Sequence, residues 1–178
     1  MGRNIEIKAA ARNFSRQQLL AEAAASCEGK FTQRDTFFAV ERGRLKVRAF
    51  ADGTGELIYY HREDASGPRP SDYTINKTTS ADSLRNILAE ILPVVGEVIK
   101  QRALFLAEQT RIHFDRVEGL GEFIELEVVL RDGQKACEGE AIAIEWMERL
   151  EITQADLLSD AYIDMLSATG SADGHCSG

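Results

Sequence analysis

The chain has 178 residues, of which 44% are hydrophobic, so it can bury the core of one domain and has the composition of a soluble globular protein. Its 29 acidic residues outnumber its 21 lysines and arginines, and the net charge of -8 argues against nucleic acid or an anionic membrane as the main partner, while a small anionic ligand stays compatible. No apolar run approaches the roughly 20 residues of a membrane helix.

The ends of the chain and its cysteines bear on location and domain limits. The N-terminus leads directly into a predicted strand, so we expect no secretory signal. The three cysteines are odd in number and lack the spacing of a metal site, which favours reduced thiols in a cytoplasmic protein. The last residues are small, polar and rich in glycine, so we expect one domain over residues 1–166 and a disordered tail over residues 167–178.

The first predicted element is a short strand in which Asn4, Glu6 and Lys8 alternate with two isoleucines. The alternation puts the polar and the apolar side chains on opposite faces. A helix is expected next, because Ser15 and the glutamine three residues later form a capping-box pattern before an apolar stripe. We expect this helix to end near Gly29.

Four further strands are predicted in the first half of the chain, separated by turns and by a proline-rich loop at 63–71. Three cations share one face of the second of these strands. A single cationic strand is most often a solvated surface, so the pattern becomes informative only if other strands repeat it. The four strands cover residues 30–39, 44–48, 56–62 and 72–78.

The middle of the chain contains a second helix and another charged strand. Ser80 or Asp82 caps the helix, and Pro93 ends it. The strand over residues 98–106 then carries two cations, Lys100 and Arg102, on one face.

The stretch over residues 110–128 predicts a β-hairpin, since both arms alternate with period two and two glycines supply the turn. Same-face neighbours on a strand lie about 6.5 Å apart, so two glutamates at that spacing repel each other unless a divalent cation lies against them. A solvated sheet face is the commoner explanation, and the hairpin alone leaves both open. The polar face consists of Arg111, His113 and Asp115 on the first arm and Glu125 and Glu127 on the second.

The end of the chain is predicted to be helical. A helix is expected over residues 132–150, although Gly139 argues against its continuity. Thr153 and Asp156 form a capping-box pattern before a short helix, and residues 159–166 can add a last turn or two.

Seven or eight predicted strands therefore share an apolar face and a charged face. Such a sheet tends to curl or close, and the apolar stripes of the helices can be buried only against the apolar strand faces. The charged faces must then point into a closed or half-closed barrel, where cations can hold a multivalent anion and carboxylates can hold Mg²⁺ or Mn²⁺. The expected lumen cations are Lys8, Arg44, Lys46, Arg48, Arg62, Lys77, Lys100, Arg102 and Arg111, and the anions are Glu6, Asp35, Glu56, Asp115, Glu125 and Glu127.

These segments resemble the CYTH domain family, the triphosphate tunnel metalloenzymes, which include class IV adenylate cyclases, thiamine triphosphatases and inorganic triphosphatases. The strand at residues 4–8 resembles the family's Glu-x-Glu-x-Lys signature, and six further segments match in order. The resemblance implies an α+β fold in which an eight-stranded antiparallel closed β-barrel, the triphosphate tunnel, has helices packed outside. The further segments are residues 33–38, 43–48, 56–62, 100–102, 111–115 and 121–127.

The resemblance also implies roles for particular residues. Many hydrolases of the family use a lysine on the fourth strand to help activate water; here that place holds Arg62, whose guanidinium stays protonated and cannot be a base. Lys8 and Arg62 are the expected catalytic residues, and the general base stays open. Phosphate oxygens are expected to bind to Lys8, Arg44, Lys46, Arg48, Arg62, Lys100, Arg102 and Arg111, and Mg²⁺ or Mn²⁺ to Glu6, Asp115, Glu125 and Glu127.

Asn4 replaces the first glutamate of the signature, which leaves open whether one or two metals bind. Three functions follow from the resemblance. The first is hydrolysis of inorganic triphosphate, a nucleoside triphosphate or thiamine triphosphate. The second is a class IV adenylate cyclase that converts ATP to cyclic AMP and pyrophosphate, and the third is a non-catalytic module that binds polyphosphate or a nucleotide. Each implies a small-molecule triphosphate as partner and a monomer or homodimer. His113 is either a proton shuttle or a hydrogen-bonded residue of the lumen.

Overall fold

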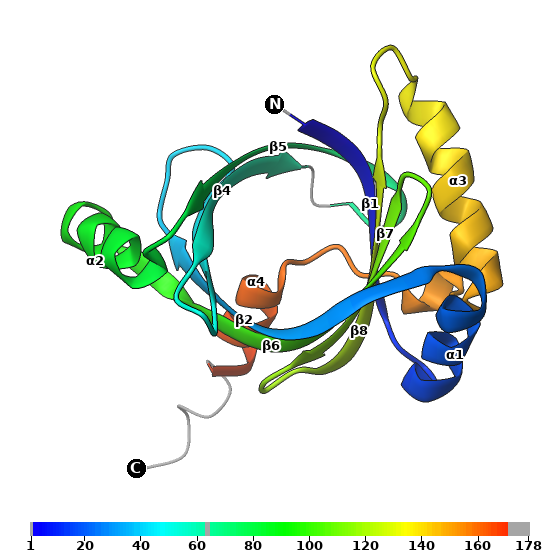
Figure 1. The fold of residues 1–178 in the computed structure, drawn as a ribbon, viewed down its shortest axis with the longest axis horizontal. Coiled ribbons are helices and arrows are strands. Elements are labelled where there is room, and N and C mark those ends of the chain that lie inside the picture. Colours follow the sequence, from blue (N-terminus) through cyan, green and yellow to red (C-terminus); the bar gives the residue numbers. More distant parts are fainter. Residues whose placement is uncertain (1, 63–64, 171–178) are drawn as a thin grey trace.

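Eight antiparallel strands close into a barrel in the order β1-β5-β4-β3-β2-β6-β7-β8 (Figure 1), within the residues 2–62 and 65–170 that the computed structural model describes. This confirms the predicted fold. The strands are β1 Gly2–Ala10, β2 Ser26–Phe38, β3 Arg44–Phe50, β4 Gly55–Arg62, β5 Arg69–Thr78, β6 Val94–Ala107, β7 Thr110–Val117 and β8 Gly121–Val129. The helices are α1 Phe14–Ala24, α2 Ala81–Ile91, α3 Ala136–Arg149 and α4 Tyr162–Gly170, with a 3-10 turn at Gln154–Asp156.

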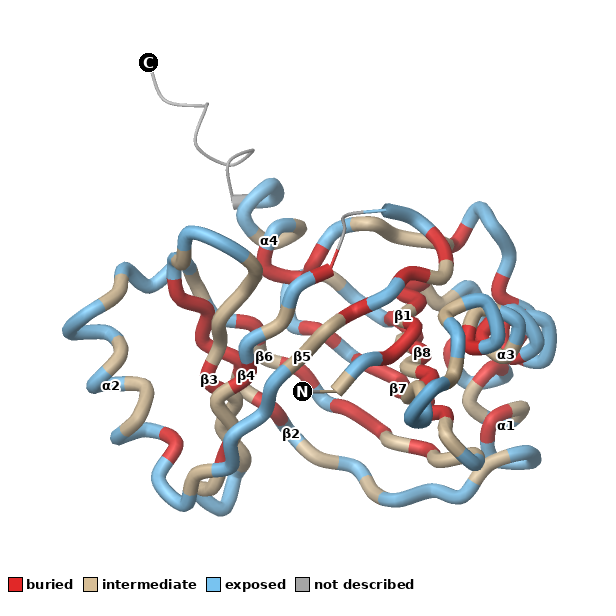
Figure 2. Tube along the Cα trace, turned by 90° about the horizontal axis from the view of Figure 1, so that it is seen from above, coloured by how far each residue is buried: buried red, intermediate tan, exposed pale blue. Residues whose placement is uncertain are grey.

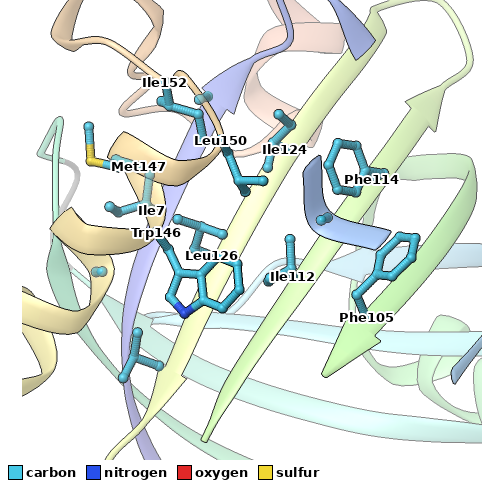
Figure 3. Packing of buried hydrophobic residues seen from close by; sticks show 14 of the residues in the cluster. Ile7, Phe105, Ile112, Phe114, Ile124, Leu126, Trp146, Met147, Leu150 and Ile152 are labelled. Atoms are coloured by element: carbon cyan, nitrogen blue, oxygen red, sulfur yellow. The ribbon is translucent and has the colours of Figure 1, made fainter. Parts of the chain in front are cut away.

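The largest hydrophobic core lies outside the barrel, between β1, β6, β7 and β8 and the helices α1 and α3 (Figure 3). Ile5 and Ile7 of β1 are fully buried in it, as are Ile112 of β7 and Leu126 of β8. Because side chains alternate along a strand, burial of these apolar residues on the outside turns the charged residues between them into the lumen. The alternation read from the sequence is therefore confirmed.

Gly139 is required for the close approach of α3 to the barrel. A Cβ atom at this position would lie 2.5 Å from Leu130 Cδ2 and 2.7 Å from Ile5 Cγ1. The glycine lets the helix axis come close enough for Trp146 and Met147 to enter the core. Helix α3 continues through Gly139 without a break. It begins at Ala136, four residues later than the sequence predicts.

Several further boundaries differ from the sequence expectation: β5 begins at Arg69 and β6 at Val94, each earlier than predicted, and the first helix and β2 differ as well. The first helix begins at Phe14, and its cap is Asn13, whose side chain accepts a hydrogen bond from the backbone of Arg16 at 3.2 Å. Strand β2 begins at Ser26, because β2 and β6 form a long antiparallel pair that continues past a register shift between Cys27 and Gly29. Such a shift interrupts the two-residue period, and so hides the start of the strand in the sequence.

Helix α4 lies at one end of the barrel (Figures 1 and 2). It extends to Gly170, so residues 167–170 of the expected tail are helical, while residues 171–178 lie outside the described part of the chain. Cys27 and Cys137 are free thiols. No helix among the described residues has the length and apolarity that crossing a membrane requires.

Candidate functional site

The inward faces of the strands line a cavity of about 620 Å³ inside the barrel. Each of the eight strands contributes at least two lining side chains that are polar or aromatic. Ten predicted site residues line it together: Glu6, Lys8, Lys46, Arg48, Arg62, Lys100, Arg102, Arg111, Glu125 and Glu127.

One group of cations on the cavity wall surrounds Asp35. Lys46 Nζ lies 2.6 Å from Asp35 Oδ2, and Arg48 Nε lies 2.8 Å from Oδ1. Burial alone would raise the pKa of Asp35, but Arg48 and Lys46 outweigh it and hold this pKa well below its usual value. Burial lowers the pKa of Lys46 to about 8 despite the facing carboxylate. Lys46 therefore changes charge near neutral pH, whereas Arg48 stays protonated.

A second group of cations surrounds Asp115. This carboxylate is fully buried, lies 2.9 Å from Lys100 Nζ and accepts hydrogen bonds from Arg102 Nε at 2.6 Å and Nη2 at 2.5 Å. Burial opposes its ionisation, but Arg102 and Lys100 bring its pKa down to about 2. Arg102 Nη2 also donates to Glu125 Oε2 and so stands between the two carboxylates. Asp115 is thus beside the predicted metal ligands, with Arg102 in between.

Glu125 and Glu127 meet a third potential ligand in His113. Its Nδ1 lies 3.8 Å from Glu125 Oε2 and 3.7 Å from Glu127 Oε1, and the three ligand atoms lie within 4.8 Å of one another. Burial and the nearby Arg102 lower the pKa of His113, so the ring is neutral at pH 7 and can offer a lone pair. Two carboxylates and a neutral imidazole fit a divalent cation.

Glu6 lies on the neighbouring strand, directly opposite Glu127 in the β1–β8 pairing. Its Oε1 lies 3.6 Å from Arg62 Nη1 and 3.5 Å from Arg69 Nη2. Burial raises the pKa of Glu6 even though Arg62 opposes the shift. Of the four predicted metal ligands, Glu125 and Glu127 are therefore grouped with His113, while Glu6 faces two arginines.

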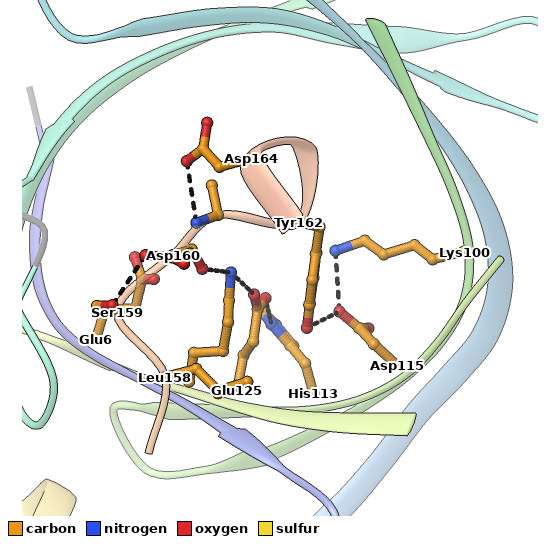
Figure 4. A network of polar contacts seen from close by, with 12 residues as sticks. Glu6, Lys100, His113, Asp115, Glu125, Leu158, Ser159, Asp160, Tyr162 and Asp164 are labelled. Carbon is orange, nitrogen blue, oxygen red and sulfur yellow. Dashed lines mark hydrogen bonds and ion pairs between the residues drawn. The ribbon is translucent and has the colours of Figure 1, made fainter. Parts of the chain in front are cut away.

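The two predicted catalytic residues contact the segment that leads into α4. Figure 4 shows Leu158, Ser159 and Asp160 of this segment, followed by Tyr162. Lys8 Nζ donates to the carbonyl oxygen of Asp160 at 3.0 Å, and it lies 3.9 Å from the centre of the Tyr162 ring and 3.5 Å from Glu125 Oε1. Arg62 Nη1 donates to the carbonyl oxygen of Ser159 at 3.2 Å. Burial lowers the pKa of Lys8.

Sequence reasoning missed Tyr162 and Arg69. Tyr162 lines the cavity and donates from its hydroxyl to Asp115 Oδ2 at 3.2 Å. Arg69 donates to the carbonyl oxygen of Leu158 at 3.2 Å and pairs with Glu6. Nothing in the sequence marks either residue, because Arg69 follows a proline-rich loop and Tyr162 opens an isolated helix. Only the tertiary fold brings this segment across the end of the barrel.

Arg44 and Lys77 lie outside the main cavity lining. Arg44 lines a small depression with Tyr60 and Arg62, and its Nη2 donates to Asp164 of α4 at 2.6 Å. Lys77 is exposed near the end of β5. Lys77 is on the same face of β5 as Ser71, Tyr73 and Ile75, which line the cavity, and it lies opposite Glu56, but its side chain is exposed and does not itself line the cavity.

Apolar side chains line part of the cavity near the start of β1, away from α4. Phe31 and Phe50 pack edge to face there, with ring centres 6.4 Å apart, and Leu104 lines the same cavity. The side-chain oxygens of Asn4 and Gln33 are buried and have no hydrogen-bond partner among the described residues. The cavity thus joins a group of charged side chains to a part with aromatic faces and two buried, unpartnered amide oxygens.

The CYTH domain family model matches residues 2–162. No curated protein sequence matches the chain. Among solved structures, the PH1012 protein of Pyrococcus horikoshii OT3 is 22% identical, with a TM-score of 0.81 over 90% of this chain and 98% of that one. A Vibrio parahaemolyticus protein provisionally called an adenylate cyclase is 16% identical, with a TM-score of 0.75 over 92% and 97%.

HpAC1 from Hippeastrum, provisionally an adenylyl cyclase with a dominant triphosphatase activity, is 15% identical, with a TM-score of 0.62 over 96% of both chains. At these identities the structural matches establish a shared barrel fold.

Proposed function

Because the chain belongs to the CYTH domain family, we propose that it is a metal-dependent enzyme that hydrolyses a triphosphate held inside its barrel. The observation that carries the proposal is a single walled cavity in which several lysines and arginines surround the group of His113, Glu125 and Glu127. A triphosphate is a multivalent anion that brings its own divalent cation, so it needs both features together.

The cationic side chains would bind and orient the phosphate chain. Phosphoryl transfer depends mainly on positioning and on stabilising charge, and a walled cavity strengthens both effects. Lys46 and Arg48 from β3 and Lys100 and Arg102 from β6 line the same cavity. Each is paired with Asp35 or Asp115, so these buried carboxylates hold the cations in fixed positions before the substrate arrives.

A divalent cation bound at Glu125 and Glu127 would offset the charge that develops on the phosphate oxygens. Lys8 lies 3.5 Å from Glu125, beside that group, where its positive charge would bind a phosphate oxygen. Its lowered pKa also leaves a larger fraction of the amine unprotonated, and so able to accept a proton, than in an exposed lysine. Arg62 would contribute charge alone, since a guanidinium does not give up its proton.

The apolar side chains near the start of β1 favour an organic triphosphate over inorganic triphosphate as the substrate. A purely anionic ligand would gain little from contact with Phe31, Phe50 and Leu104. A planar ring attached to the phosphate chain could stack on the two aromatic rings and pack against the leucine. The same side chains also support the second candidate function, adenylate cyclase activity, because cyclisation requires the protein to bind the nucleoside as well as the phosphates.

One incubation separates these functions. The protein is given ATP, thiamine triphosphate or inorganic triphosphate with Mg²⁺ and, separately, with Mn²⁺. Free phosphate is the expected product. Cyclic AMP with pyrophosphate would select the cyclase, and binding without turnover would select a non-catalytic module.

A further inference from the structure

His113 Nδ1 is a buried nitrogen with no hydrogen-bond partner among the described residues. The residue is 4% exposed, and it lies on β7 directly opposite Glu125 of β8. The ring lies against this glutamate inside the barrel (Figure 4). A buried polar atom without a hydrogen-bond partner costs folding free energy. Binding of a ligand from outside the protein chain would explain why this nitrogen is buried here.

The neighbouring carboxylates do not satisfy this nitrogen directly. The distances of 3.8 Å to Glu125 Oε2 and 3.7 Å to Glu127 Oε1 exceed those of a hydrogen bond. A buried nitrogen that faces two carboxylates across such gaps has the arrangement of three ligands around one cation.

We propose that His113 is a nitrogen ligand of the divalent cation held by Glu125 and Glu127, and that this site binds a first-row transition cation in preference to Mg²⁺. The proposal rests on the metal dependence of the proposed function and adds the identity of a ligand and of the cation class. Imidazole suits transition cations, whereas Mg²⁺ strongly prefers oxygen ligands.

The dimensions of the group fit this assignment. Ligand atoms at about 2.1 Å from one ion lie about 3.0–3.5 Å apart. The observed gaps of 3.8 and 3.7 Å from His113 and the limit of 4.8 Å for all three ligand atoms are wider than this, so the side chains would move toward the ion by less than their own length. Arg102 donates to Glu125 and Lys8 lies near it, which makes the group less negative than two isolated carboxylates would be. We therefore expect a bound triphosphate, which adds negative charge, to tighten cation binding.

The direct test is electron spin echo spectroscopy of Mn²⁺ bound to the whole protein, with and without inorganic triphosphate. Protein with ¹⁴N histidine should show modulation from a directly bound nitrogen, and labelling with ¹⁵N histidine should change that modulation. The signal should vanish in His113→Asn and persist in His61→Asn, since His61 is exposed on β4 and lies outside the main cavity. Bound Mn²⁺ without nitrogen modulation would overturn the proposal.

A titration gives an independent readout. Calorimetry of wild type should show Mn²⁺ binding more tightly than Mg²⁺, and His113→Asn, which replaces the nitrogen by an amide oxygen, should reduce that ratio by about tenfold. An unchanged ratio in a folded His113→Asn variant would contradict the assignment. If neither cation binds wild type with or without triphosphate, the proposed metal-dependent function itself fails.

Discussion

Arg102 donates two hydrogen bonds to Asp115, from Nε at 2.6 Å and from Nη2 at 2.5 Å. The pair is buried inside the barrel, and Lys100 completes it at 2.9 Å. Removing this carboxylate would leave Lys100 without its ion-pair partner and Arg102 with Glu125 alone. Asp115 therefore organises the cations of the cavity whether or not it also contacts a metal.

We expect Asp115→Asn to lower the free energy of unfolding by about 3–5 kcal/mol, because the loss of one partner leaves buried charge uncompensated. Urea unfolding in the absence of divalent cations measures this effect. Asp164→Asn is a suitable comparison, since its ion pair with Arg44 is partly exposed and should contribute much less. Equal stability of wild type and Asp115→Asn would show that the pair does not support the fold.

Glu127→Gln should abolish metal-dependent turnover and weaken cation binding while the barrel stays folded. The change removes charge with little change of shape, and Glu127 is less buried than Asp115. The control is Glu122→Gln on the same strand, where the glutamate is exposed and pairs with Arg116 at 3.0 Å. Calorimetric titration with Mn²⁺ and a phosphate-release assay report the two effects. Full activity of Glu127→Gln would remove this residue from the metal site.

Affinity for triphosphate should fall as the pH rises above about 8, because burial brings the pKa of Lys46 to about 8 and the protonated amine is the form that binds phosphate. Below that pKa the charge is fully present; above it, this residue's contribution declines by up to about tenfold per pH unit. In Lys46→Arg this residue's part of the decline should be absent, since the guanidinium stays charged. Binding curves at several pH values decide the matter, and identical profiles for the two proteins would exclude Lys46 as the titrating group.

Phe50→Ala should weaken the binding of ATP or thiamine triphosphate by about tenfold and leave inorganic triphosphate unaffected, because stacking of a ring on an aromatic side chain contributes about 1–3 kcal/mol. The inorganic ligand serves as the internal control, since it meets the same cations and has no ring. Competition binding measures all three ligands in one assay. An equal loss for all of them would show that Phe50 supports the barrel rather than the organic group.

The sequence could predict which residues of each strand face the lumen, because side chains alternate between the two faces of a strand. Ile5 and Ile7 on β1, or Ile112 on β7, must be buried, so the charged residues between them face the lumen. The sequence also brought Glu125 and Glu127 to one face. It could not reveal that Arg102 separates Asp115 from them, since this depends on which of several cations reaches which carboxylate once the barrel has closed.

The contacts made by the end of the chain were beyond prediction for a related reason. Lys8 and Tyr162 are separated by more than 150 residues, and no period or motif connects them. The sequence cannot decide whether His113 is a proton shuttle or a hydrogen-bonded residue of the lumen, because its neighbours on β8 are fixed only by the strand register. In each case the local pattern specifies the face of a strand, and the closure of the barrel specifies the partner.

The segment that runs into α4 covers one end of the described barrel, where it accepts hydrogen bonds from Lys8, Arg62 and Arg69. Under the proposed hydrolysis, a product fragment on the side of α4 would leave most easily through the opposite end of the barrel, after the other fragment. The order of product release would then follow from the direction in which the substrate entered, and the fragment that leaves last would compete with new substrate for the protein.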